Sequence, residues 1–221
     1  MTGRASTALF DRWSRTYDSP TLQRLTYRPL HDAVSRRLVR TQPAVLLDLG
    51  CGTGQLTQRL VHDLPQSRVV GLDLSAGMIR RASDRHAPAG DATLLQANAM
   101  HLPFPANTFD AVVCTESFHW YPNQQQVLDG LADVVRPGGH VVIVSVAAVT
   151  DAGDRMIRAA SSAGGNTIRA LPPRRLRDGL LRSGFEIVDQ RRIPRVGLIP
   201  WPVLTEARLG MGVPHDNATE R

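Results

Sequence analysis

Three glycines at alternate positions, Gly50, Gly52 and Gly54, stand between an apolar run and a segment with apolar residues at helical spacing. A turn this tight needs backbone angles that glycine adopts easily, and it lets a ligand touch the main chain. The amides at the start of the following helix favour an anionic or polar group of that ligand. The spacing therefore predicts a ligand-binding turn between a strand and a helix.

A carboxylate, Asp73, ends the next apolar run, nineteen residues after Gly54. A carboxylate in this place can accept hydrogen bonds from both hydroxyls of a ribose. The dinucleotide fingerprint G-x-G-x-x-G, started at Gly50, would require a glycine where Gln55 stands. The spacing G-x-G-x-G, preceded by Asp48, therefore argues against a nicotinamide- or flavin-dependent oxidoreductase.

Polar and aromatic side chains are concentrated in residues 114–122, after the fourth expected strand. His119 is the candidate general base there, because the ordinary pKa of histidine lies near neutrality. Alternatively, His119 and Trp120 pack the start of the following helix. The seven histidines of the chain are scattered, with no pair at ligand spacing, so no metal site is expected.

Short β-branched runs alternate with helix-like segments, and these are the elements that must position the residues above. Helices are expected at 54–64, from 123 to the stop signal Pro137-Gly138-Gly139, within 171–184, and at 75–87 with Ser75 as its N-cap. Strands are expected at 43–50, 67–75, 92–99, 109–117, 140–148, 185–193 and 201–209. The alternation predicts an α/β fold with a Rossmann-like, seven-stranded, mostly parallel sheet and helices on both faces.

Two further segments flank or interrupt this pattern. Residues 1–40 are expected to form an N-terminal helical cap of the same domain, with Pro29 starting its second helix. Residues 41–212 then form the main domain, and 213–221 a C-terminal tail. Residues 149–173 are rich in small side chains and are expected to be mobile, beside an open or modestly sized acceptor pocket.

The composition is that of a globular protein with an unusual choice of basic residue. All 26 basic residues are arginine, and they are spread along the chain among 20 acidic residues despite a net charge of +6. Because nucleic-acid footprints are clustered, no nucleic-acid surface is expected. No apolar run is long enough to cross a membrane, and the N-terminus lacks a secretory apolar core, which favours a cytoplasmic location. Cys51 and Cys114 are expected to be reduced core residues.

In order along the chain, the motifs LLDLGCGTG, VVGLDLSAGMI, ANAMHLPFPANTFDAVVC and RPGGHVVI resemble those of class I S-adenosylmethionine-dependent methyltransferases. The resemblance covers about residues 8–150 and is nearest to the ubiquinone/menaquinone-biosynthesis-like small-molecule branch, with a methyltransferase type 11 domain. It implies S-adenosylmethionine as cofactor and S-adenosylhomocysteine as product.

The resemblance also implies roles for individual residues. The glycine loop, with Cys51, would pass under the methionine part of the cofactor, Asp48 would lie near its amino group, and Asp73 would hold the ribose. The remaining implied contacts are Leu74 and Met78 on the adenine face, Asn98 and Ala99 at the adenine edge, Thr115 beside the sulfonium, and Tyr17 in a lid. The family often has aspartate at the position of Asn98, and an amide can still accept and donate hydrogen bonds there.

The predicted function is methyl transfer to an unidentified small molecule at O, N or C, mainly by positioning the reactants. A nucleic-acid methyltransferase, an NAD-dependent oxidoreductase and a non-catalytic binding module remain alternatives. In the lid segment, Phe10 and Trp13 would line the acceptor side, although an amphipathic helix that buries them with Tyr17 explains the pattern almost as well. The sequence predicts no oligomeric state.

Overall fold

The structure is a computed structural model that describes residues 26–86, 92–163, 167–194 and 202–211. Its strands are β1 (Val45–Leu49), β2 (Arg68–Asp73), β3 (Ala92–Gln96), β4 (Phe109–Thr115), β5 (Val135–Ser145), β6 (Phe185–Arg192) and β7 (Val203–Leu209). Its helices are α3 (Arg28–Thr41), α4 (Gln55–Asp63), α5 (Ala76–His86), the 3-10 turn η2 (Phe118–Trp120), α6 (Gln124–Val134), α7 (Asp151–Ala163) and α8 (Pro173–Arg182).

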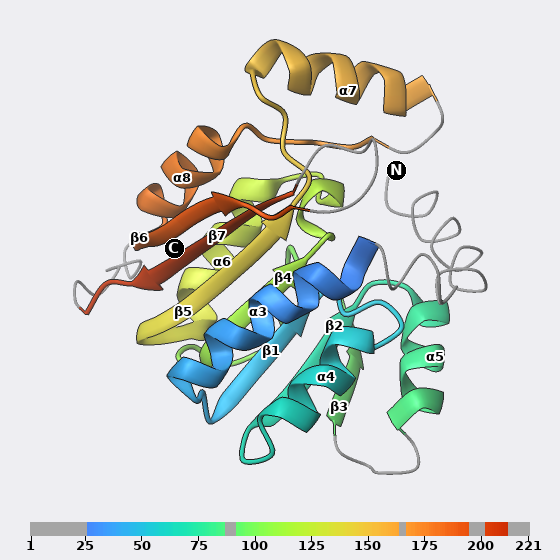
Figure 1. Cartoon of the computed structure of the whole chain (residues 1–221), viewed down its shortest axis with the longest axis vertical. Helices are drawn as coiled ribbons and strands as arrows, with labels where there is room; N and C mark the ends of the chain where they lie inside the picture. Colours follow the sequence, from blue (N-terminus) through green and yellow to red (C-terminus); the bar gives the residue numbers. More distant parts are fainter. Residues whose placement is uncertain (1–25, 87–91, 164–166, 195–201, 212–221) are drawn as a thin grey trace, which may run out of the picture.

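The seven strands form one sheet in the order β3-β2-β1-β4-β5-β7-β6 (Figure 1). The first five are parallel to one another, and β7 runs antiparallel to both of its neighbours. The predicted seven-stranded, mostly parallel sheet is therefore confirmed. Because β1, β2, β4 and β5 point the same way, the loops after them meet at one edge, called the carboxyl edge below.

Alternate residues of the central strands pack into two separate hydrophobic cores, one on each face of the sheet. Leu46 and Val113 pack with α3 and α4 on one face of the sheet, whereas the next residue of β1, Leu47, packs with α6 and α8 on the other. Helix α5 lies against β2 and β3 beside α4. The strand period of two thus explains why nearly every residue of β1 and β4 is apolar: both faces of these strands are covered.

The part of the predicted N-terminal cap that the structure describes is a layer of this core. Helix α3 begins with Pro29 in its first turn, as expected, and buries Leu30, Ala33, Val34 and Leu38. These residues lie in the same apolar cluster as α4 and β4. Removing the helix would therefore uncover one face of the sheet.

Two elements differ from the sequence expectation. Strand β5 begins at Val135, five residues early, and takes in Pro137 and Gly138 through a register shift against β4. Residues 151–163, expected to be a mobile segment, form helix α7 above the carboxyl edge (Figure 1). Asp151 and Asp154 lie in its first turn, where they interact favourably with the helix dipole, and Thr150 Oγ1 accepts from the Gly153 amide at 3.1 Å.

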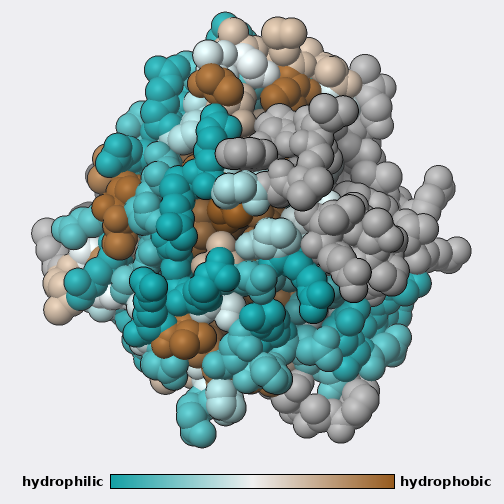
Figure 2. Space-filling view, in the orientation of Figure 1, coloured by the Kyte–Doolittle hydropathy of each residue, from teal (hydrophilic) through white to brown (hydrophobic). Residues whose placement is uncertain are grey.

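Helix α7 packs few apolar residues against the sheet. Its Met156 is 72% exposed and the preceding Val149 is 76% exposed. Figure 2 accordingly shows hydrophobic side chains at the top of the molecule among hydrophilic ones. In the described ranges, no helix is long and apolar enough to cross a membrane.

Candidate cofactor and acceptor site

The loop between β1 and α4 has the backbone conformation that its glycines predicted. Gly50, Gly52 and Gly54 have φ angles of +74°, +55° and +77°. A Cβ atom on Gly50 would lie 2.4 Å from Ser117 Oγ, and one on Gly54 would lie 3.0 Å from the Cβ of Ala82 in α5. Conformation and close packing therefore both require glycine at these two positions.

Asp73, at the end of β2, ties this loop to the next helix. Its Oδ2 accepts from the Gly52 amide at 2.9 Å, and its Oδ1 accepts from the Ser75 amide at 2.8 Å. Ser75 Oγ in turn accepts from the Met78 amide at 3.1 Å, so the predicted N-cap of α5 is confirmed. The carboxylate is thus fixed at the carboxyl edge directly beside the glycine loop.

Asp48 lies beneath the loop at the end of β1 and is 1% exposed. Burial raises the pKa of this carboxyl to about 7, while a hydrogen bond from Thr57 lowers it and the charge of Asp73 raises it further. The Thr57 hydroxyl donates to Asp48 Oδ2 at 2.7 Å. Asp48 is therefore a buried carboxyl that gains or loses its proton near neutral pH.

A cavity with about 320 Å³ of empty space, part of it open to solvent, opens above Asp48. It is lined by residues of the glycine loop, the start of α4, the end of β4 and helix α3: Tyr27, His31, Asp48, Gly50, Cys51, Thr53, Gln55, Leu56 and Thr115. Thr115 Oγ1 is buried there and has no hydrogen-bond partner among the described residues. An unpaired buried hydroxyl is unfavourable, and a bound polar ligand would satisfy it.

Five of the lining residues were not identified from the sequence as parts of a site: Tyr27, His31, Thr53, Gln55 and Leu56. Burial lowers the pKa of His31 to about 4; Asp32 acts in the opposite direction and Arg59 in the same direction. Its ring is therefore neutral at physiological pH and can accept as well as donate a hydrogen bond. Tyr27 and His31 are four residues apart, so a common helix face was the available signal.

The residues expected on the adenine side lie at the ends of β2 and β3. Leu74 is 43% exposed beside Asp73, so its side chain is accessible to an apolar face of a ligand. Met78, by contrast, is 3% exposed and is buried on α5. The Asn98 side-chain oxygen accepts from the Met100 amide at 3.0 Å, so this oxygen already closes a turn, while Ala99 is buried next to it.

The remaining expected site residues divide between the core and the undescribed ranges. Cys51 is 8% exposed, and burial raises the pKa of its thiol well above the ordinary value, with the charges of Asp48 and Asp73 adding to the effect. Cys51 helps to line the cavity above Asp48, but its thiol is no thiolate nucleophile. Tyr17, together with Phe10 and Trp13, lies outside the described residues. Among those that are described, no three His, Cys, Asp or Glu side chains could hold a metal ion.

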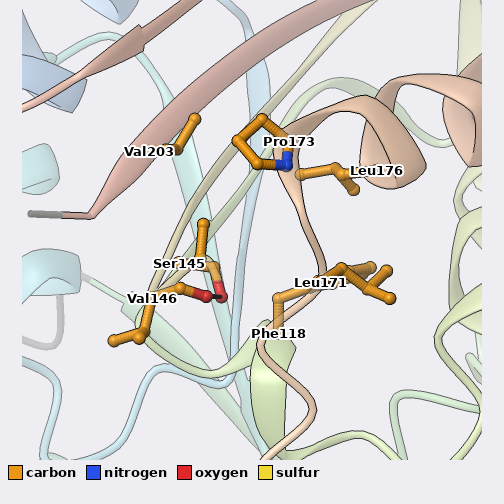
Figure 3. Close-up of a pocket in the computed structure, with 8 residues that line it drawn as sticks. Phe118, Ser145, Val146, Leu171, Pro173, Leu176 and Val203 are labelled. Carbon is orange, nitrogen blue, oxygen red and sulfur yellow. Dashed lines mark hydrogen bonds between the residues drawn. The ribbon is translucent and has the colours of Figure 1, made fainter. Parts of the chain in front are cut away.

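His119 lies in η2 and is 5% exposed. Its Nδ1 is 3.1 Å from Ser145 Oγ at the end of β5, which fixes the ring plane. Ser145 also lines a small pocket at the carboxyl edge, shown in Figure 3, whose other lining residues are apolar: Phe118, Val146, Ala147, Leu171, Pro173, Leu176 and Val203. His119 therefore connects η2 to the end of β5, although it is not among the residues that line this pocket or the cavity above Asp48. Packing and proton transfer, the two interpretations from the sequence, are both compatible with this position.

These features define a class: an α/β protein with a nucleoside-type ligand site over the carboxyl ends of β1 and β2. Comparisons with known proteins show which members of this class the chain resembles. The methyltransferase domain family matches residues 47–143. Trans-aconitate 2-methyltransferase of Afipia carboxidovorans is 33% identical over 52% of this chain and 43% of its own length. The ubiquinone/menaquinone biosynthesis C-methyltransferase of Syntrophotalea carbinolica is 32% identical over 67% of this chain and 64% of its own.

The fold comparison agrees. The 1,6-didemethyltoxoflavin N1-methyltransferase of Burkholderia thailandensis superposes with a TM-score of 0.72 at 18% identity, covering 94% of this chain and 88% of that one. Residues 47–143 therefore match a methyltransferase domain, and the chain is similar in sequence and fold to methyltransferases of small molecules. It spans 43% to 64% of the length of the two curated relatives named above.

Proposed function

We propose that this chain transfers the methyl group of S-adenosylmethionine to a small-molecule acceptor. The observation that carries the proposal is the cavity beside the positive-φ glycine loop, where buried Asp48 and the unpaired Thr115 hydroxyl face the same space. An aminocarboxyl chain with a sulfonium would supply partners for both, and Asp73 is placed to accept from ribose hydroxyls next to it. The relatives named above support methyl transfer, and they act on chemically different small molecules.

When bound, the cofactor supplies a methyl group already activated for displacement by its sulfonium. The residues of this chain then bind and orient. Asp48 receives the amino group, Asp73 the ribose, and exposed Leu74 the adenine face, while the Asn98 amide group and Ala99 lie at the adenine edge. Thr115, at the end of β4, lies beside the sulfonium, and we assign the lid role to Tyr17.

A small molecule is favoured over nucleic acid because many arginines are already neutralised. Arg37 pairs with Asp189 and Glu206, Arg136 with Asp110, and Arg174 with Asp151. Each such pair removes a positive charge that could otherwise contact a phosphate backbone.

Calorimetric titration with S-adenosylhomocysteine tests the cofactor assignment. We expect one site per chain with a dissociation constant in the micromolar range, and no binding of NAD. Circular dichroism of the same sample establishes that the protein is folded. A folded sample that binds NAD in preference to S-adenosylhomocysteine would exclude the proposal, and acceptor screening with a labelled methyl donor follows a positive result.

We further propose His119 as the proton acceptor for acceptors that lose a proton. Replacing it with glutamine should lower kcat about 100-fold near neutral pH, because general-base catalysis contributes factors of this order. The loss should shrink as pH rises, since hydroxide increasingly ionises the acceptor, while affinity for S-adenosylhomocysteine stays unchanged. A loss below about 5-fold, independent of pH, would mean that His119 only packs. The matched control Ser145→Ala removes the Nδ1 contact but keeps the ring.

A further inference from the structure

Residues 167–171 are held across the carboxyl edge between α7 and η2. On the α7 side, the Ile168 amide donates to Ser161 Oγ at 2.9 Å. On the sheet side, the Ala148 amide, just after β5, donates to the Ala170 carbonyl at 3.0 Å. Residues 167–171 therefore lie between helix α7 and His119, the proposed base.

Within this segment, Arg169 is hydrogen-bonded directly to His119. Its amide donates to the His119 carbonyl at 2.8 Å, and its own carbonyl accepts from Gln124 Nε2 at 3.0 Å. Gln124, which is 8% exposed, also donates to the Phe118 carbonyl at 3.0 Å. The backbone of Arg169 is thus fixed to η2 through its amide and to the start of α6 through its carbonyl.

The charge on this side chain is not balanced locally. Among the described residues, the Arg169 guanidinium makes one hydrogen bond, to the Thr167 carbonyl at 3.3 Å, and no ion pair. The neighbouring carboxylate, Asp154, already pairs with Arg158 at 2.6 Å. Of the two guanidinium groups near Asp154, only that of Arg158 pairs with it, so the charge of Arg169 is left without an ion-pair partner among the described residues.

The pKa of Arg169 also indicates that its positive charge is not balanced by its surroundings. Burial lowers the pKa of Arg169 below the ordinary value, the positive charge of Arg158 lowers it further, and Asp154 raises it. A partly buried guanidinium that another guanidinium repels gains most from an added anion. Carboxylates and phosphates match its planar donor fork in two parallel hydrogen bonds.

We propose that Arg169 binds an anionic group, a carboxylate or a phosphate, of the methyl acceptor and so selects acidic acceptors. The proposal rests on the proposed function, because it takes the acceptor to lie beside His119 over the carboxyl edge. The apolar residues beside Ser145 in Figure 3 would then contact the body of such an acceptor. Arg158 would hold Asp154 away from the anion.

The test uses the full chain saturated with S-adenosylhomocysteine and matched pairs of probes: octanoate against octanamide, benzoate against benzamide, and phenyl phosphate against phenol. In at least one pair we expect the anion to bind about 10-fold or more tightly than its neutral partner. Arg169→Gln should reduce this preference to about 2-fold and leave S-adenosylhomocysteine binding unchanged. The carboxylate and phosphate arms show which anion fits.

The matched control is Arg155→Gln, which removes the same charge from an exposed position on α7. It should leave the preference intact, because a general loss of positive charge acts only weakly through solvent. Absence of any preference in a protein that binds S-adenosylhomocysteine would overturn this inference while leaving the proposed function standing. An equal loss in both variants, or a loss of stability in Arg169→Gln with the preference retained, would also overturn it.

Discussion

Replacing Asp73 with alanine should weaken S-adenosylhomocysteine binding by about 100-fold or more. The proposed ribose contacts are two hydrogen bonds to an ionised group, each contributing about 1.5 kcal/mol or more, and about 3 kcal/mol corresponds to this factor. The same carboxylate accepts from the amides of Gly52 and Ser75, so the variant also loosens the glycine loop. Calorimetric titration of the parent and the variant measures the change in affinity.

Two additional variants separate the ligand contact from the loop contacts. Asp84→Ala removes an exposed acidic residue from the same region and should change affinity less than 2-fold, within the range of an exposed charge. Asp73→Asn retains one acceptor oxygen and most of the side-chain volume, so it should lose less stability than alanine while still binding poorly. If Asp73→Ala bound S-adenosylhomocysteine as tightly as the parent, the ribose assignment would be wrong.

The features that the sequence predicted best are those in which local chemistry and tertiary structure agree. Leu46 and Leu47 lie in a run that is apolar at every position, and this is the pattern of a strand covered on both faces. Gly50 and Gly54 had to accommodate unusual φ angles and close neighbours, which no other residue type does easily. The position of Asp73 beside the glycine loop was predictable because this residue ends the apolar run that forms β2.

Features that depend on distant partners were not predictable in the same way. His31 belongs to the cavity only because α3 packs over β4 and α4, a contact that the sequence around His31 does not encode. Helix α7 is amphipathic, but Gly153 and the alanines and serines at 159–163 are small residues that favour a mobile segment when the sequence is considered alone. Pro137 and Gly138 are ordinary stop signals, yet here they lie in an irregular start of β5.

Arg169 illustrates a third case. It lies in no sequence motif, and the acidic residues nearest to it along the chain, Asp154 and Asp178, are many positions away. Its interest comes from the hydrogen bonds that fix its backbone to η2 and from the pairing of Asp154 with Arg158. The proposed acceptor contact therefore depends on long-range packing, whereas the proposed cofactor contacts lie in short sequence motifs.

Replacing Asp48 with asparagine should stabilise the protein above pH 7 and weaken cofactor binding. The pKa of Asp48 is raised from 3.8 to about 7 in the folded state, so the folded protein holds a proton there that the unfolded chain releases. Ionised Asp48 therefore opposes folding: stability decreases as pH rises from about 4 to 7 and stays reduced above that. Asparagine carries no charge and can still accept from Thr57, so it removes this penalty, which is at most about 4 kcal/mol.

Urea unfolding of the parent and Asp48→Asn at pH 4, 7 and 8.5 measures this effect. The difference in unfolding free energy should be small at pH 4 and largest at pH 8.5. His31 has the opposite effect on stability. Its pKa is lower in the folded state than in the unfolded chain, so the protein loses stability as pH falls from about 6.5 to 4. This contribution is the same in the parent and the variant and cancels in the difference. A gain that does not vary with pH would show that Asp48 is not the titrating group.

The same variant links stability to function. If ionised Asp48 receives the cofactor's amino group, binding draws the carboxyl into its charged form and releases a proton near pH 7. Titration of the parent with S-adenosylhomocysteine in buffers of different ionisation enthalpy should detect this proton, and Asp48→Asn should release none while binding at least about 10-fold more weakly. If Asp48→Asn is more stable but binds S-adenosylhomocysteine more weakly, the charge of Asp48 destabilises the fold and is needed to bind the ligand. Stability gained with affinity unchanged would place the amino group elsewhere in the cavity.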